Sequence, residues 1–148
     1  MIELTKKTIT ILAPVERVFE HVINMENYKF WFPDVIAIQA NDTQPHASVG
    51  KTYLETLAIA GSDQTLTIKV VECVKNTTFV TQGDLVGILP QMTVCFWENE
   101  LGCQLELSYH SRESTLNEQS PIIMGLRENL APRAETGLTQ LKHLLENP

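Results

Sequence analysis

The chain has 148 residues, of which 43% are hydrophobic and 20% charged, and its formal net charge is −7. This is the length of one domain, which we expect to span residues 1–148 and to fold without metal or disulfide. The negative charge argues against binding to phosphate backbones or anionic lipid headgroups. No segment approaches the ~18 apolar residues of a membrane span. We therefore expect neither nucleic acid nor integral membrane association.

The three cysteines, Cys73, Cys95 and Cys103, are an odd number without CxxC spacing. This usage predicts reduced thiols and a cytoplasmic location, and the cysteines read as small core residues. The first twelve residues alternate polar and apolar side chains, which is not the pattern of a signal peptide.

The N-terminal third predicts a strand followed by two short helices. Alternation predicts a strand over Ile2–Leu12. A helix then begins at Pro14, suited to a first helical position, and ends near Asn24. Its apolar stripe consists of Val15, Val18, Phe19 and Val22. A second short helix is predicted over Asn24–Phe32, capped by Asn24 and stopped by Pro33.

Six further strands follow, separated by segments with turn chemistry such as Gly50, Gly61-Ser62-Asp63 and Lys75-Asn76. Short turns between successive strands predict an antiparallel meander. The predicted strands are Val35–Gln44, Lys51–Ala60, Gln64–Val74, Thr78–Gly83, Gln91–Glu98 and Cys103–Arg112.

The last element is predicted to be a long helix from Ser120-Pro121 to Glu146. At 1.5 Å per residue it spans ~39 Å, similar to the width of seven strands at ~4.8 Å spacing. The helix can therefore cross the whole sheet. Pro132 removes one helical hydrogen bond, and we expect a kink there.

This order of elements predicts an α+β, helix-grip domain. We expect a seven-stranded antiparallel curved sheet wrapped around a long C-terminal helix, with two short helices after the first strand. Ile9–Phe19 combines an alternating strand, Ala-Pro, and a helix in which Val precedes an aromatic residue. Asn27-Tyr28, Trp31-x-Pro33 and Val49-Gly50 follow. These motifs resemble START-related (SRPBCC) proteins.

That superfamily includes polyketide cyclase/dehydrase-like proteins, coenzyme Q-binding proteins and lipid-transfer domains. The resemblance implies an apolar cavity between the sheet and the terminal helix. A bent sheet and a straight helix cannot stay in contact along their whole length, so the gap suits an apolar ligand. A core filled entirely by side chains is the alternative.

Strand parity gives the expected lining of this gap. Cys103, Leu105, Leu107 and Tyr109 share one face of the last strand. Together with equivalent rows of the other strands, the predicted ligand-binding residues are Trp31, Tyr53, Glu55, Leu57, Leu66, Ile68, Phe79, Met92, Val94, Phe96, Leu105, Leu107, Tyr109, Leu126 and Leu130.

Glu55 and Tyr109 are the candidate catalytic residues. If Tyr53, Glu55 and Leu57 face inward, the Glu55 carboxyl enters an apolar pocket, where its pKa rises and it can act as a general acid or base. If the strand is offset by one residue, Glu55 is solvated instead.

The connection from Gly83 to Met92 holds the apolar cluster Leu85–Leu89, which is unusual for a loop. It is interpreted as a cavity lid, a partner contact, or a segment packed on the terminal helix. The histidines His21, His46, His110 and His143 lack metal-ligand spacing, and we expect no metal and no cofactor.

Three functions remain open. The first is a non-enzymatic binding protein for a hydrophobic small molecule such as a lipid, isoprenoid or polyketide-like compound. The second is a cyclase or dehydratase that orients a flexible substrate and moves a proton. The third is an interaction module that uses the Leu85–Leu89 loop for a protein partner or a homodimer.

Overall fold

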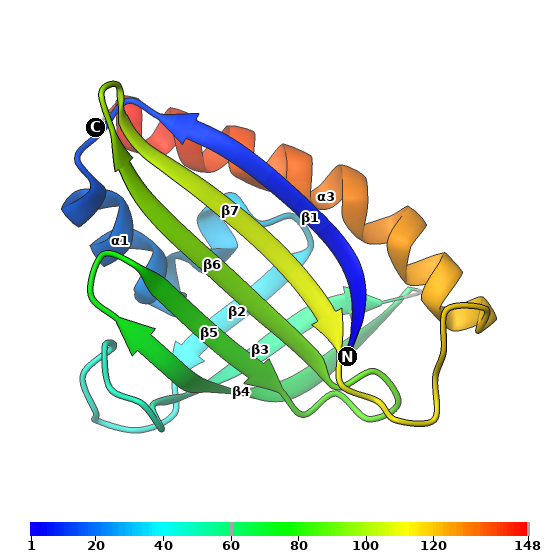
Figure 1. Cartoon of the computed structure of the whole chain (residues 1–148). Helices are drawn as coiled ribbons and strands as arrows, with labels where there is room; N and C mark the ends of the chain where they lie inside the picture. The colour runs from blue at the N-terminus through cyan, green and yellow to red at the C-terminus, as the bar shows by residue number, and fades with distance from the viewer. Residues whose placement is uncertain (60, 148) are drawn as a thin grey trace.

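The structure of the chain is a computed structural model that describes residues 1–59 and 61–147. Its elements confirm the predicted helix-grip fold (Figure 1). In chain order they are β1 (Ile2–Ile11), α1 (Val15–Ile23), the 3₁₀ helix η1 (Met25–Asn27), α2 (Tyr28–Trp31), β2 (Val35–Ala40), β3 (Thr52–Ile59), β4 (Ser62–Val74), β5 (Thr78–Gly83), β6 (Pro90–Asn99), β7 (Gly102–Ser111) and α3 (Pro121–Glu146).

The seven strands form one antiparallel sheet in the order β1-β7-β6-β5-β4-β3-β2. The run from β2 to β7 is the predicted meander, and β1 pairs with β7. Register shifts between Glu3 and Thr5, between Val35 and Ala37, and between Val70 and Glu72 interrupt the ladders. Such bulges bend a strand and increase its twist, which favours a curved sheet.

Several predicted boundaries were wrong by a few residues. β2 ends at Ala40 instead of Gln44, because Asp42 turns the chain: its Oδ1 accepts from the Gln44 backbone N–H and its Oδ2 from that of Thr52. β4 begins at Ser62, which pairs with Ile59, two residues before the predicted start at Gln64. The predicted β3 end, Ala60, lies outside the described residues.

The predicted second helix is divided into η1 and α2. The side chain of Asn24 accepts a hydrogen bond from the Glu26 backbone N–H, as expected of a cap. α2 ends before Phe32, which takes an extended conformation because Pro33 follows it.

Helix α3 continues through Pro132 without interruption, and the kink expected there stays a prediction. A Cβ on Gly137 would lie 3.2 Å from the Trp31 carbonyl oxygen and 3.1 Å from Phe32 Cδ2. The glycine therefore lets α3 lie close against α2. Figure 1 shows α3 running alongside β1, with α1 and α2 behind the sheet.

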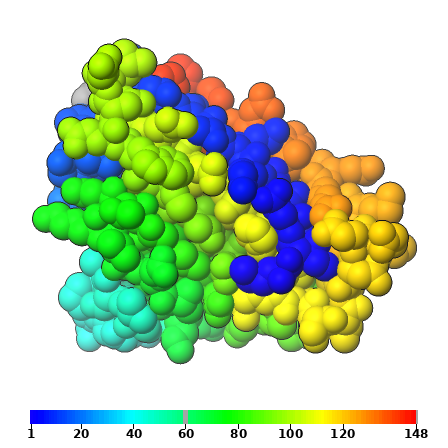
Figure 2. Space-filling model, viewed as in Figure 1, coloured from blue at the N-terminus to red at the C-terminus, as the bar shows by residue number. Residues whose placement is uncertain are grey.

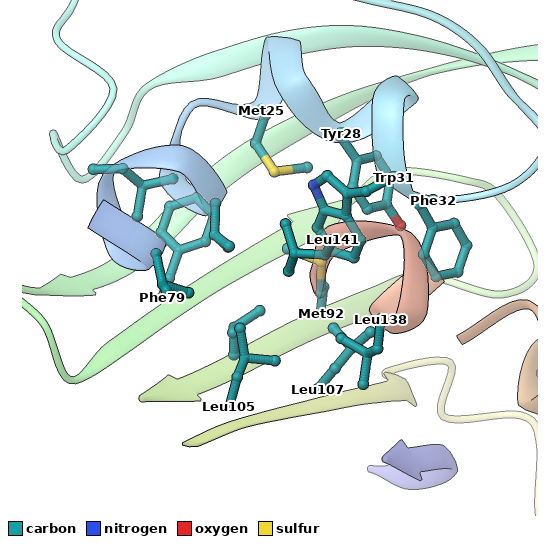
Figure 3. Close-up of a cluster of buried hydrophobic side chains, with 14 of the residues drawn as sticks. Met25, Tyr28, Trp31, Phe32, Phe79, Met92, Leu105, Leu107, Leu138 and Leu141 are labelled. Carbon is teal, nitrogen blue, oxygen red and sulfur yellow. The ribbon is translucent and has the colours of Figure 1, made fainter. Parts of the chain in front are cut away.

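The main core lies between the sheet, the two short helices α1 and α2, and the C-terminal half of α3. Figure 3 shows Tyr28, Trp31 and Phe32 from α2 and the residue after it near Leu138 and Leu141 of α3. The predicted inward face of β7 is confirmed, since Cys103, Leu105, Leu107 and Tyr109 are all buried. On the outer face, the side chains of β1, β5, β6 and β7 form a continuous surface (Figure 2).

Within residues 1–59 and 61–147, no helix is long and apolar enough to cross a membrane. The same residues contain no cluster of three or more His, Cys, Asp or Glu side chains that could hold a metal ion. Cys73, Cys95 and Cys103 are free thiols.

Candidate ligand cavity

A cavity of about 330 Å³ lies between the sheet and the N-terminal half of α3. β3, β4, β5 and β6 form one wall, and α2 and α3 contribute the opposite side. Most of the lining is apolar. It consists of Leu4, Met25, Tyr28, Phe32, Asp34, Glu55, Leu57, Ala58, Leu66, Ile68, Thr81, Gly83, Leu85, Ile88, Pro90, Met92, Tyr109, Leu126, Asn129, Leu130 and Arg133.

The residues predicted from strand parity divide into two groups. Those that line the cavity are Glu55, Leu57, Leu66, Ile68, Met92, Tyr109, Leu126 and Leu130. The others are buried in the packed core outside this lining, and they are Trp31, Tyr53, Phe79, Val94, Phe96, Leu105 and Leu107. Single strands contribute to both groups: Val94 and Phe96 pack in the core, whereas Met92 of the same strand lines the cavity.

Some lining residues were missed, although the sequence carried a signal for them. Arg133 follows Leu126 and Leu130 at helical spacing, so it lies on the same face of α3. Thr81 continues the inward row of β5 that begins at Phe79. Both are polar, so they do not belong to the apolar rows from which the lining was predicted.

The Glu55 carboxyl is the main polar group of the cavity wall. Its residue is only 6% exposed, and the predicted inward orientation of Tyr53 and Glu55 is confirmed by their burial. Among the described residues, no group forms a hydrogen bond or ion pair with this carboxyl. Burial raises the pKa of Glu55 to about 7, partly offset by the positive charge of Arg133. Both protonation states are therefore populated near neutral pH.

Two tyrosine hydroxyls form a second polar group. Tyr28 from α2 and Tyr109 from β7 are hydrogen-bonded to each other through their hydroxyls, and both line the cavity. Burial raises the pKa of each phenol, so both are neutral at physiological pH. One O–H donates to the other oxygen, which leaves the second hydroxyl hydrogen available for another acceptor.

The guanidinium of Arg133 contacts neighbouring protein groups through an ion pair, two hydrogen bonds and a ring face. Its Nε lies 3.2 Å from Asp34 Oδ2 in an ion pair without hydrogen-bond alignment. Nη1 donates to Asn129 Oδ1 and Nη2 donates to the Pro33 carbonyl oxygen. The group also lies over the Phe32 ring, 5.2 Å from its centroid. These contacts hold α3 against the α2–β2 connection.

The apolar loop Leu85–Leu89 forms one part of the cavity wall. Leu85 and Ile88 line the cavity, whereas Val86 is 92% exposed. The Leu89 N–H donates to the Leu85 carbonyl oxygen, which closes a single turn. Ser111 Oγ donates to the Ile88 carbonyl oxygen at 2.5 Å, so the loop is attached to the end of β7. Whether it opens as a lid stays a prediction.

The chain was compared with known proteins. No protein-family model and no curated protein matches its sequence. Protein CV1439 from Chromobacterium violaceum is 15% identical, with a TM-score of 0.71, over 97% of this chain and 98% of that one. The di-domain ARO/CYC StfQ from the steffimycin biosynthetic pathway is 14% identical, with a TM-score of 0.75, over 98% of this chain and 51% of that one. Ara h 8.0201 is 12% identical, with a TM-score of 0.71, over 97% of both chains.

These likenesses concern the fold. The chain has the predicted helix-grip fold, and the likeness to these structures extends over nearly its whole length.

Proposed function

We propose that this protein binds a hydrophobic small molecule, such as a lipid, isoprenoid or polyketide-like compound, between the sheet and α3. The cavity of about 330 Å³ supports the proposal most directly. Its volume falls within the range of roughly 300–1,000 Å³ found for small-molecule sites, and its lining is mostly apolar. Among the similar folds, StfQ is named as an ARO/CYC of a biosynthetic pathway.

The cavity volume limits the ligand to a small molecule. An apolar cavity of about 150 Å³ holds one benzene, so this one accommodates roughly a dozen non-hydrogen atoms. Burial of roughly 300 Å² of apolar ligand surface contributes about 7.5 kcal/mol, from which association costs of several kcal/mol are subtracted. The tightest affinity expected from apolar burial is therefore a micromolar dissociation constant.

The test compares two leucine-to-tryptophan variants on the same helix. Leu130 lines the cavity, so Leu130→Trp should fill it and weaken binding of a fluorescent apolar probe by at least about tenfold. Leu144 is 40% exposed and outside the lining, so Leu144→Trp should bind the probe as the parent chain does. Probe affinity that Leu130→Trp leaves unchanged would place binding elsewhere and contradict the proposal.

A second candidate, an enzyme of the cyclase or dehydratase type, is favoured by one observation. Glu55 lines the cavity with a pKa of about 7, which suits a general acid or base at neutral pH, and Tyr109 lines the same cavity. Such an enzyme should turn over a poly-β-keto substrate with a pH-rate inflection near 7 that Glu55→Gln removes. Binding of the same substrate without turnover would contradict the enzyme and support the binding function.

A further inference from the structure

Resting on the proposed function, we infer that the cavity selects an apolar molecule bearing one uncharged hydroxyl group, an alcohol or phenol, over a molecule of equal size bearing a carboxylate. The inference depends on three polar groups of the wall: the Glu55 carboxyl, the Tyr28–Tyr109 hydroxyl pair and the Arg133 guanidinium.

Glu55 supplies a hydrogen-bond acceptor that lacks a partner. A polar group that loses water without gaining a hydrogen bond is costly to bury. The Glu55 residue is only 6% exposed, and its carboxyl has no hydrogen-bond partner among the residues that the structure describes. A ligand hydroxyl removes that cost by donating to a carboxylate oxygen. An alkyl ligand without a polar group leaves the cost in place.

The tyrosine pair supplies the complementary donor. Tyr28 and Tyr109 use one of their two hydroxyl hydrogens on each other, and the remaining one has no acceptor within the described part of the chain. A ligand hydroxyl both donates and accepts, so it can satisfy Glu55 and the free tyrosine hydrogen together. The two partners lie in one cavity, and Glu55 acts electrostatically on both phenols.

A carboxylate finds no cation in this lining that lacks an anionic partner, because the positive charge of Arg133 is paired with Asp34. Arg133 is the cation among the described residues that line the cavity. Asp34 lies 3.2 Å from its Nε, and two of its five N–H groups donate to Asn129 and to the Pro33 carbonyl oxygen. A ligand carboxylate would also meet Glu55 when Glu55 is ionised, which costs energy at low dielectric. The chain's formal net charge of −7 disfavours anions further.

The preference should depend on pH. The charged and titratable groups that act on Glu55 or share its cavity are Arg133 and Asp34, which are paired, and the neutral Tyr28 and Tyr109. Below pH 7 a protonated Glu55 can donate to a carboxylate ligand. Above pH 7 the ionised Glu55 repels that ligand but still accepts from a hydroxyl.

The experiment measures 1-octanol and sodium octanoate, two ligands with the same alkyl chain, by displacement of the fluorescent apolar probe and by calorimetry. At pH 8.5 we expect octanol to bind about tenfold more tightly, the effect of one charge-assisted hydrogen bond. At pH 6 the ratio should be smaller, while octanoate itself stays ionised because free carboxyl groups titrate near pH 4 to 5.

Glu55→Gln keeps the size of the side chain and removes its charge. It should reduce the octanol-to-octanoate ratio at pH 8.5 at least about fivefold and abolish its pH dependence. Glu135→Gln, on the exposed face of α3, is the matched control and should change neither. Circular dichroism checks that both variants fold. If Glu55→Gln does not fold, the pH series on the parent chain still tests the inference.

The outcomes separate the two proposals. Octanoate affinity equal to or above that of octanol at pH 8.5 would overturn the hydroxyl inference and leave the binding function intact. A ratio that stays constant from pH 6 to pH 8.5, or that Glu55→Gln does not change, would also overturn it. A chain that binds neither ligand nor the probe would contradict the binding function itself.

Discussion

The two halves of α3 carry similar apolar spacing but meet the sheet differently. After Arg133 the helix packs against the core. The buried residues of this half are Ala134, Gly137, Leu138, Leu141 and Leu145. Before Arg133, Leu126 and Leu130 are half-buried and line the cavity, and Ile123 is fully buried. One half of the helix therefore contributes mainly stability, and the other encloses a space for a ligand.

Aromatic side chains of α2 and of the residue that follows it explain the difference. At the packed end, Trp31 and Phe32 lie between α3 and the sheet, and Gly137 permits close contact with them (Figure 3). At the hollow end Tyr28 and Phe32 border the space without filling it, so the sheet and the helix enclose a cavity. Stability is lost there, because the cavity wall forgoes dispersion contacts and Glu55 is buried without a partner.

The largest expected effect tests this division directly. Leu141→Ala, at the packed end, should lower the free energy of unfolding by about 2–5 kcal/mol, because the 0% exposed side chain leaves a cavity in a filled core. Leu130→Ala, at the hollow end of the same helix, should cost less than about 1 kcal/mol, because it enlarges a space that already exists. Urea unfolding measures both, and equal losses would contradict the comparison.

The second prediction concerns the pH dependence of stability at the hollow end. The folded-state pKa of Glu55 is about 7 and its ordinary value is 4.5, so the folded chain holds more protons than the unfolded chain between these pH values. The free energy of unfolding therefore falls as pH rises from about 4.5 to about 7, by about 3 kcal/mol for this carboxyl alone.

Glu55→Gln should remove this decline, so that the variant is more stable than the parent chain at pH 8 and not at pH 4. Burial and the charge of Arg17 lower the pKa of His21, which makes a contribution of opposite sign below pH 6.5. The difference between parent and variant cancels that contribution. Denaturant titrations at a series of pH values measure it, and parallel profiles for the two proteins would show that Glu55 is solvated.

Strand periodicity predicted the fold and the inward faces, because alternation identifies the face on which a residue lies. The same alternation carries no information about which end of a strand is filled. Val94 and Met92 are equivalent by parity, yet one is packed and the other lines the cavity. That distinction depends on where Trp31 of α2 and the following Phe32 pack, which is a tertiary contact.

The polar wall was predictable only in part. Glu55 was identified by parity on β3, and its burial follows from the register that places it opposite Leu66. Tyr28 belongs to the Asn27-Tyr28 motif, but its hydroxyl contact with Tyr109 joins residues 81 positions apart, which no local pattern indicates. The partners of Arg133 likewise come from the α2–β2 connection.

A third prediction sharpens the boundary between the two ends, where Tyr28 and Tyr109 meet. Tyr28→Phe should cost about 1 kcal/mol, since it removes a buried hydrogen bond and keeps the ring. Tyr109→Phe should cost a similar amount, and the double variant should cost clearly less than the two together. Thermal or urea unfolding supplies the double-mutant cycle, in which additive losses would mean that the hydroxyl contact contributes nothing.

The smallest expected effect concerns the Leu85–Leu89 loop, which closes the hollow end. Val86 is 92% exposed, so Val86→Ser should change the free energy of unfolding by no more than about 0.5 kcal/mol and leave probe affinity unaltered. Leu85→Ser should weaken probe binding, because Leu85 lines the cavity. If the loop is a wall of the cavity, the molecular mass measured by light scattering should not change in either variant. A mass that falls in Val86→Ser would instead identify the loop as a contact between copies of the chain.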